Sequence, residues 1–445
     1  MKPLVLQHVE LDGRPTEVRI ADGVIDRVGS DLVRPGDVVV DGAGGALTPG
    51  LHDHHLHLAA MAAARESVDV GEDRDLDGAV VAAGATGDGW IRVVGYHEAV
   101  HGPLDRHRLD RLAAGRPVRA QHQTGARWVL NTLALEAIGG LEAHPDGVLD
   151  GRDDWLRSRV PSVVLDLPAV GRDLASLGVT GCTDATPTER LDDLRLLAVA
   201  ALPQRITVTG GPGLAAELPP APLLPGPVKL LLADHSLPEL DHVVAAIGVA
   251  RAAGRTVAVH AVTLAATLLA LAAWDEVGPV EGDRLEHGSV LPPEAAERVA
   301  RAGLRVVTQP GFLWAHGDRY RRNVDAADRP HLYRCAGLIE AGIRVAGSTD
   351  APYGPSDPWV AIRAAVDRRT RTGAVLGPGE RVLPSAALAL FQTPGHDPGG
   401  PIRRLVPGAV ADLCLFDAPL RTVLDDLDPG HLRAVYIGGA PVWVR

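Results

Sequence analysis

Four histidines lie within six residues, in the segment His52-Asp53-His54-His55-Leu56-His57. The segment follows residues 46–51, which the apolar pattern predicts to be a buried strand. Side chains two apart on a strand point to the same side, so His55 and His57 could reach one metal ion together. Neutral imidazole is a common zinc ligand. A polar, histidine-rich loop is the alternative interpretation, and a locally bent chain could bring His52 or His54 into the site instead.

Three further candidate ligands end predicted strands. His260 ends the strand 256–260, His287 ends 284–287, and Asp350 ends 345–350. Catalytic groups in a parallel α/β barrel lie at the carboxyl ends of its strands. Any one of these residues alone would more often be a structural residue of a core or loop. All three lie at the ends of predicted strands, as His55 and His57 do, and this shared position predicts a metal site.

Lys229 is an unusual residue for this chain, which has 44 basic residues, of which only Lys2 and Lys229 are lysine. It lies in the apolar stretch 227–232, where burial should lower its pKa. A neutral amine can react with carbon dioxide to give a carbamate, an anionic oxygen ligand able to bridge two metals. A neutral or ion-paired structural lysine is the alternative.

Strand and helix patterns alternate through the middle of the chain, and this alternation predicts an α/β fold, a (β/α)8 or TIM barrel over residues 48–404. The predicted strands are 46–51, 179–183, 205–209, 228–233, 257–260, 284–287, 305–308 and 344–347. The helical patterns include 237–253, 261–274 and 293–302. More than 120 residues separate the first two strands, so residues 59–175 are predicted to be an insertion or lid.

Both ends of the chain have short strand patterns and tight-turn signals. Asp22-Gly23 separates two strand-like runs near the N-terminus, and Gly438-Gly439 does so near the C-terminus. Residues 1–47 and 405–445 are therefore predicted to join into one small composite β-sandwich domain.

Composition narrows the class of protein. The net charge is −12, and the sequence has no run of basic residues. A nucleic acid or an anionic membrane is therefore not expected as a partner. The longest largely apolar stretch, 261–274, is too short to span a bilayer. The three cysteines are far apart and form no CxxC pair, and the N-terminus has no signal-peptide core. We expect a cytoplasmic enzyme with a small-molecule substrate, and a homodimer is compatible with the sequence.

The candidate ligands together resemble the amidohydrolase superfamily strand by strand. The flanking segments are similar to its family 3, the branch of YtcJ-like proteins and N-substituted formamide deformylases. The similar segments are residues 121–125, 128–131, 178–180, 308–310 and 350–352. The resemblance extends over nearly the whole chain.

The resemblance implies a metal-dependent hydrolase that cleaves a carbon–nitrogen bond of the amide type, of an N-acyl or N-formyl compound, with a metal-bridging hydroxide. It implies two divalent metals, with zinc expected. His55 and His57 with Asp350 would hold one metal, His260 and His287 the other, and carboxylated Lys229 would bridge them. Asp350 would take the hydroxide proton and deliver it to the leaving amine.

The sequence indicates substrate contacts less clearly than metal ligands. Each candidate for a substrate contact could equally be a packed or solvated loop residue. Gln309 ends the seventh strand, and Trp314 is expected in a following loop with Phe312, His316 and Tyr320. The remaining candidates lie in the insertion: Tyr96, His97, His122, Gln123 and Trp128.

Two other functions remain open from the sequence. One is a mononuclear deaminase or cyclohydrolase of the same superfamily, although such enzymes usually have a Glu shortly after the fifth-strand histidine, and residues 261–264 here contain no carboxylate. The other is a catalytically inactive barrel that serves as a binding protein, which the complete ligand set disfavours.

Overall fold

The computed structural model describes residues 2–445 except 72–73, 87, 114, 126 and 162–164. The chain divides into two compact units, Met1–His57 with Leu167–Arg445, and Leu58–Asp166. The insertion predicted at 59–175 therefore ends earlier in the structure. Helix α7 (Leu167–Ser176) belongs to the first unit because its buried face, which includes Val170 and Leu174, packs against strands of that unit.

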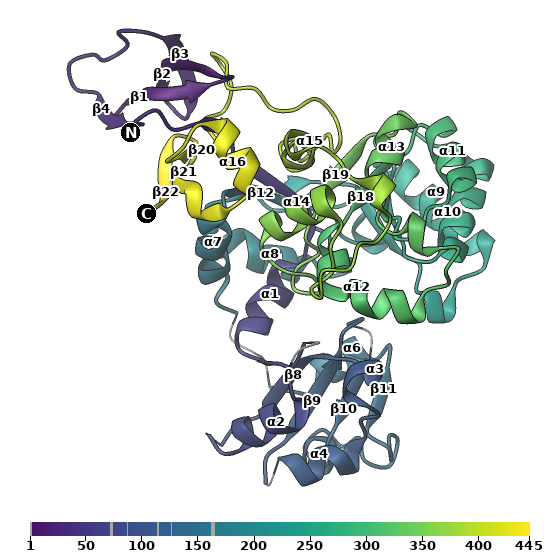
Figure 1. Ribbon diagram of the computed structural model, residues 1–445. Coiled ribbons are helices and arrows are strands. Elements are labelled where there is room, and N and C mark those ends of the chain that lie inside the picture. Colours follow the sequence, from purple (N-terminus) through teal and green to yellow (C-terminus); the bar gives the residue numbers. More distant parts are fainter. Residues whose placement is uncertain (1, 72–73, 87, 114, 126, 162–164) are drawn as a thin grey trace. The chain divides into compact units, whose positions relative to one another are not determined.

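Eight parallel strand positions form the barrel of the first unit (Figure 1). The fourth position is split into two short segments on either side of Gly226-Pro227. The strands are β6 (Leu51–Leu56), β12 (Val179–Asp184), β13 (Arg205–Val208), β14 (Leu224–Pro225) with β15 (Val228–Leu231), β16 (Val257–Ala261), β17 (Arg284–His287), β18 (Arg305–Thr308) and β19 (Val345–Gly347).

Hydrogen bonds join the two barrel sheets, β14-β13-β12-β6 and β15-β16-β17-β18-β19, at both margins. The Lys229 N–H donates to the Gly210 carbonyl at 2.8 Å, and the Asp350 N–H donates to the His55 carbonyl at 2.8 Å. The strands are buried along most of their length, as strands of a parallel sheet covered by helices are. The predicted α/β barrel is thus the observed architecture.

Helices follow the strands and cover the barrel (Figure 1). The predicted helical patterns correspond to α9, α10 and α11. The helices of the first unit, besides α7, are α8 (Leu191–Val199), α9 (Leu240–Ala252), α10 (Leu264–Val277), α11 (Pro293–Arg301), α12 (Gly311–Asn323), α13 (Ala336–Glu340), α14 (Pro358–Asp367), α15 (Pro384–Ala389) and α16 (Leu420–Asp426).

The first barrel strand differs from its prediction. Residues 46–51 were expected to form it, but they divide between β5 (Leu47–Pro49), which pairs with β20 of a terminal sheet, and the start of β6, which pairs with β12. The histidine-rich segment is therefore largely inside β6 rather than after a strand. Gly50 makes this crossover possible, because a Cβ there would lie 2.2 Å from Thr180 Cγ2 and 2.5 Å from Thr180 Oγ1.

Both termini contribute a four-stranded sheet, and the two sheets share one hydrophobic cluster that includes Leu6, Ile20, Leu413 and Tyr436. The first sheet has the order β3-β2-β1-β4 and the second β22-β21-β20-β5. Their remaining strands are β1 (Leu4–Leu11), β2 (Arg14–Ala21), β3 (Val24–Gly29), β4 (Val38–Asp41), β20 (Leu413–Phe416), β21 (Leu432–Ile437) and β22 (Ala440–Val444).

The second unit has its own five-stranded sheet of order β11-β10-β9-β8-β7 and two hydrophobic clusters. Its strands are β7 (Val68–Asp69), β8 (Ile91–Tyr96), β9 (Val118–His122), β10 (Arg127–Leu130) and β11 (Val148–Asp150). Its helices are α1 (Leu58–Arg65), α2 (Leu76–Gly84), α3 (Glu98–His101), α4 (Arg106–Leu112), α5 (Thr132–Ala137) and α6 (Asp153–Arg157).

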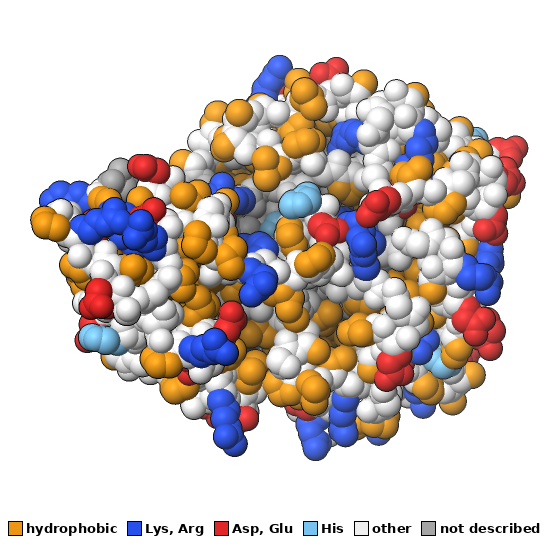
Figure 2. Space-filling view, turned by 90° about the horizontal axis from the view of Figure 1, so that it is seen from above, with side chains coloured by type: hydrophobic (Ala, Val, Ile, Leu, Met, Phe, Trp, Pro, Cys, Tyr) orange, Lys and Arg blue, Asp and Glu red, His pale blue; other side chains and the backbone are white. Residues whose placement is uncertain are grey.

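Acidic and basic side chains are interspersed over the face shown in Figure 2, which matches the absence of a basic run in the sequence. In the part of the chain that the structure describes, no helix combines the length and apolar character needed to cross a membrane.

The crossover at Gly50 predicts a specific loss of stability. We expect Gly50→Ala to lower the free energy of unfolding by about 1–3 kcal/mol, because the new methyl group must displace a β-branched side chain of β12. Gly29→Ala is the matched control, because a Cβ there has nothing within 4 Å, and it should change the stability by less than about 0.5 kcal/mol. Denaturant unfolding measures both, and equal stabilities of the two variants would contradict this role of Gly50.

Candidate metal centre

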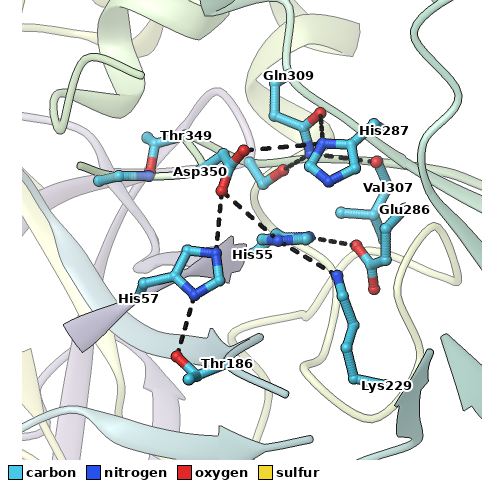
Figure 3. Close-up of polar contacts among 12 residues, drawn as sticks. His55, His57, Thr186, Lys229, Glu286, His287, Val307, Gln309, Thr349 and Asp350 are labelled. Carbon is cyan, nitrogen blue, oxygen red and sulfur yellow. Dashed lines mark hydrogen bonds and ion pairs between the residues drawn. The ribbon is translucent and has the colours of Figure 1, made fainter. Parts of the chain in front are cut away.

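The structure brings together the six candidate ligands predicted from the sequence. Their side chains come from strands β6, β15, β16 and β17, from the residue directly after β6 and from the third residue after β19, and most are drawn in Figure 3. Lys229 Nζ lies 3.4 Å from His55 Nε2. The ring centroid of His287 lies 4.8 Å from that of His55 and 4.4 Å from that of His260.

His55, His57 and Asp350 form the tightest group in this cluster. Asp350 Oδ1 lies 3.2 Å from His57 Nε2 and 3.6 Å from His55 Nε2. One ligand atom of each residue fits within a span of 4.8 Å. Two imidazoles and a carboxylate are a donor set that zinc accepts, so this group could hold a metal ion.

Three of the histidines have their Nδ1 atom held by another protein group. His55 Nδ1–H donates to Glu286 Oε2 at 2.5 Å, and His57 Nδ1 lies 3.0 Å from Thr186 Oγ1. His287 Nδ1 lies 2.8 Å from Gln309 Oε1. Figure 3 shows these contacts around the Asp350 carboxylate. The contacts leave Nε2 of each ring available to a metal, as is usual for metal-binding histidines.

The amide of Gln309 is fixed by its own contacts. Its Nε2 donates to the Val307 carbonyl at 3.3 Å and to Ser348 Oγ at 2.9 Å. Gln309 Oε1 is therefore the atom that faces His287, and His287 Nδ1 must carry the hydrogen. The other ring nitrogen, His287 Nε2, is buried and makes no hydrogen bond within the described residues. A buried acceptor without a partner is costly, and a bound cation at this position would remove that cost.

Burial sets the protonation of the imidazoles. It lowers the pKa of His55 to about 3, with a further contribution from Lys229, and it lowers the pKa values of His260 and His287. The three rings are therefore neutral near pH 7, which is the form that binds metals. The donor chemistry of the cluster thus fits a divalent metal centre.

Burial also lowers the pKa of Lys229, to about 8, although the nearby Glu286 and Asp350 carboxylates act in the opposite direction. A fraction of the amine is therefore uncharged near neutral pH. An uncharged amine is the form that reacts with carbon dioxide.

Two candidate ligands have strained backbones. The φ angle is 73° at His287 and 55° at Asp350, in the left-handed region that residues other than glycine rarely adopt. Such strain is found mainly where the surrounding structure enforces it at functional sites.

The other histidines of β6 lie outside this cluster. His52 Nε2 lies 3.1 Å from Thr183 Oγ1, and His54 Nε2 lies 2.9 Å from Thr393 Oγ1. Both rings are buried in these contacts. The structure therefore brings His55 and His57, and neither His52 nor His54, to Asp350.

The loop expected after the seventh strand is a helix instead. Phe312, Trp314, His316 and Tyr320 all lie on α12, whose N-terminus directly follows Gln309-Pro310. The guanidinium of Arg371 lies 4.4 Å from the Trp314 ring centroid. Gln309, predicted to contact substrate, is fully buried and contacts His287.

The remaining substrate candidates lie in the second unit. His122 Nε2 lies 2.9 Å from Glu98 Oε2, and one ligand atom each of His97, Glu98 and His122 falls within 4.8 Å. The Tyr96 hydroxyl donates to the Gly102 carbonyl. Gln123 lies in the turn directly after β9, and Trp128 lies on β10.

Sequence reasoning missed the residues that support the ligands. Asp53 accepts hydrogen bonds from the Thr349 hydroxyl at 2.5 Å and from the His55 N–H at 3.1 Å, and so ties β6 to the residue before Asp350. Glu286 lies two residues after Arg284 in a strand whose residues are all buried. That pair of opposite charges on one side of a buried strand was the available signal.

The model of the amidohydrolase family matches residues 38–443. The chain belongs to this family. It is 23% identical to the N-substituted formamide deformylase of Arthrobacter pascens, over 97% of this chain and 92% of that protein. It is 26% identical to the putative amidohydrolase YtcJ of Bacillus subtilis, over 81% and 82% of the two chains.

An uncharacterized metal-dependent hydrolase from Pyrococcus furiosus has a similar fold, with a TM-score of 0.73. The two proteins are 22% identical, and the match covers 96% of this chain and 99% of that chain. The family assignment makes this protein a metal-dependent amidohydrolase, a hydrolase acting on carbon–nitrogen bonds.

The orientation of the β6 histidines predicts which of them this amidohydrolase needs for metal. We expect His57→Ala to lower the metal content of the purified protein, because it removes an imidazole that faces Asp350. His54→Ala should lower stability through the buried cavity it leaves but should retain the metal. Elemental analysis of both folded variants tests this, and loss of metal in His54→Ala alone would reverse the assignment.

Proposed function

We propose that this amidohydrolase cleaves the C–N bond of a small linear amide, of the N-acyl or N-formyl type, at a centre of two divalent metals, with zinc as the expected ion. The observation that carries the proposal is the convergence of His55, His57 and His287 on one buried carboxylate, Asp350, with Lys229 Nζ 3.4 Å from His55 Nε2. The name of the Arthrobacter relative, an N-substituted formamide deformylase, supports the substrate class.

His55 and His57 with Asp350 would hold one metal, and His260 and His287 would hold the other. Lys229 would bridge them as a carbamate. In that reaction the neutral Nζ forms a bond to the carbon of carbon dioxide, and the electron pair of one C=O π bond moves to its oxygen. Nζ passes one proton to water, so the side chain gains a negative charge. A buried lysine of lowered pKa favours this reaction, whereas the arginine used elsewhere in the chain could not provide it.

Metals bound there would lower the pKa of a coordinated water and polarise the substrate carbonyl. Asp350 would provide the proton transfer, because Oδ1 faces His57 and His55 while Oδ2 lies 3.8 Å from His287 Nδ1. We propose that it accepts the proton of the attacking water and passes it to the nitrogen of the leaving amine. The neighbouring imidazoles keep the pKa of this carboxyl below its usual value, although burial acts to raise it.

The test is the hydrolysis of a panel of N-formyl and N-acyl amines. The measured quantity is the amount of free amine released. We expect turnover by the metal-loaded wild type and a fall of about 10²- to 10⁴-fold in kcat for Asp350→Asn, the range typical of a lost acid–base group. Glu297→Gln, at an exposed position of α11, is the control and should keep full activity.

Two outcomes would contradict the proposal. Release of ammonia from aminated rings, with no hydrolysis of linear amides, would select a deaminase instead. Equal rates for Asp350→Asn and the wild type would exclude the proposed proton transfer.

A further inference from the structure

Three histidines, His55, His57 and His287, have an Nδ1 atom in hydrogen-bond contact with another side chain. Among these three contacts, only that of His55 is with a charged group. Thr186 offers His57 a hydroxyl, and Gln309 offers His287 a neutral amide. Glu286 offers His55 a carboxylate oxygen at 2.5 Å. A hydrogen bond to an ionised acceptor is roughly twice as strong as one between neutral groups, so these contacts are not equivalent.

Glu286 forms a buried ion pair with Arg284 inside the barrel. Its side chain is fully buried, and Oε1 accepts from Arg284 Nε at 2.7 Å. Each carboxylate oxygen thus has one partner, Arg284 on one side and His55 on the other.

The local sequence explains this geometry. Arg284 and Glu286 are two residues apart on β17, so both side chains point to the same side of the strand, toward the barrel interior. His287 follows with a φ of 73°, which breaks the regular alternation and lets consecutive residues serve the same site. Figure 3 shows Glu286 and His287 approaching His55 and Asp350 from this one strand.

We infer that Glu286, held by Arg284, is a positioning residue that fixes the tautomer and raises the metal affinity of His55. With Nδ1–H committed to Glu286, the Nε2 lone pair of His55 can only face Lys229 and Asp350. The negative charge behind the ring also makes that nitrogen a stronger donor to a cation. The inference rests on the proposed function because it assumes that His55 binds metal.

Cobalt(II) titration of the metal-free full-length chain tests this role, with visible absorption as a report on the ligand environment. We expect Glu286→Gln to weaken cobalt affinity by about 10- to 100-fold, the range for lost partners of metal ligands, and to change the absorption band. Glu286→Asp keeps the charge but shortens the reach, so it should also bind more weakly if the hydrogen bond itself matters.

Glu380→Gln is the matched control. Glu380 is also a buried carboxylate paired with an arginine, since its Oε1 lies 2.6 Å from Arg334 Nε. Its other oxygen, Oε2, accepts from the N–H groups of Cys335 and Gly337, and neither residue is a candidate ligand. It should keep the wild-type affinity and spectrum even if it lowers stability.

An unchanged affinity and spectrum in Glu286→Gln, with a wild type that binds cobalt, would overturn the role of Glu286 and leave the proposed function standing. Equal weakening in Glu380→Gln would overturn it as well, by showing a general effect of stability. Failure of the wild type to bind cobalt would overturn the proposed metal centre and this inference with it.

Discussion

The interior of this barrel depends on one constraint, which is that buried imidazole nitrogens need hydrogen-bond partners. A buried polar atom without a partner costs on the order of 1–3 kcal/mol, and the interior holds several histidines. The protein satisfies Nδ1 of His55, His57 and His287 with Glu286, Thr186 and Gln309. Nε2 of each ring then remains available to a ligand bound beside Asp350. A divalent cation is the partner that suits neutral imidazoles and a carboxylate.

The fold provides these partners through its strand order. Glu286 lies on β17 and Gln309 directly after β18, so the support of one ligand comes from a strand other than its own. Asp53 connects the first strand to Thr349, next to Asp350. Gly50 allows the chain to pass from the terminal sheet into the barrel just before the histidines. The positions of the ligands therefore depend on the closure of the barrel rather than on any single loop.

The sequence predicted the barrel and its strands well, because buried parallel strands are apolar runs with a polar residue at the end. It also named the six residues that meet in space, since residue types such as His260, His287 and Asp350 recur at strand ends. The division of residues 46–51 between two sheets could not be predicted, because both halves are equally apolar. Helix α12 stands where the sequence predicts a loop, because its mixed polar and aromatic residues have no clear helical period.

The supporting residues could not be predicted because hydrogen bonds between strands distant in sequence leave no local pattern. The contact of Glu286 with His55 spans 231 positions, and that of Thr349 with Asp53 spans 296. Only the opposite charges of Arg284 and Glu286 within a buried strand gave a local indication.

We propose that Lys229 bridges two metals, and elemental analysis of the wild type beside Lys229→Ala is the experiment that tests this proposal. We expect about two metals per chain in the wild type, as binuclear hydrolases hold, and one or none in the folded variant. One metal per chain in both proteins would contradict the binuclear centre, and no metal in either, after growth with ample zinc, would contradict the metal site altogether.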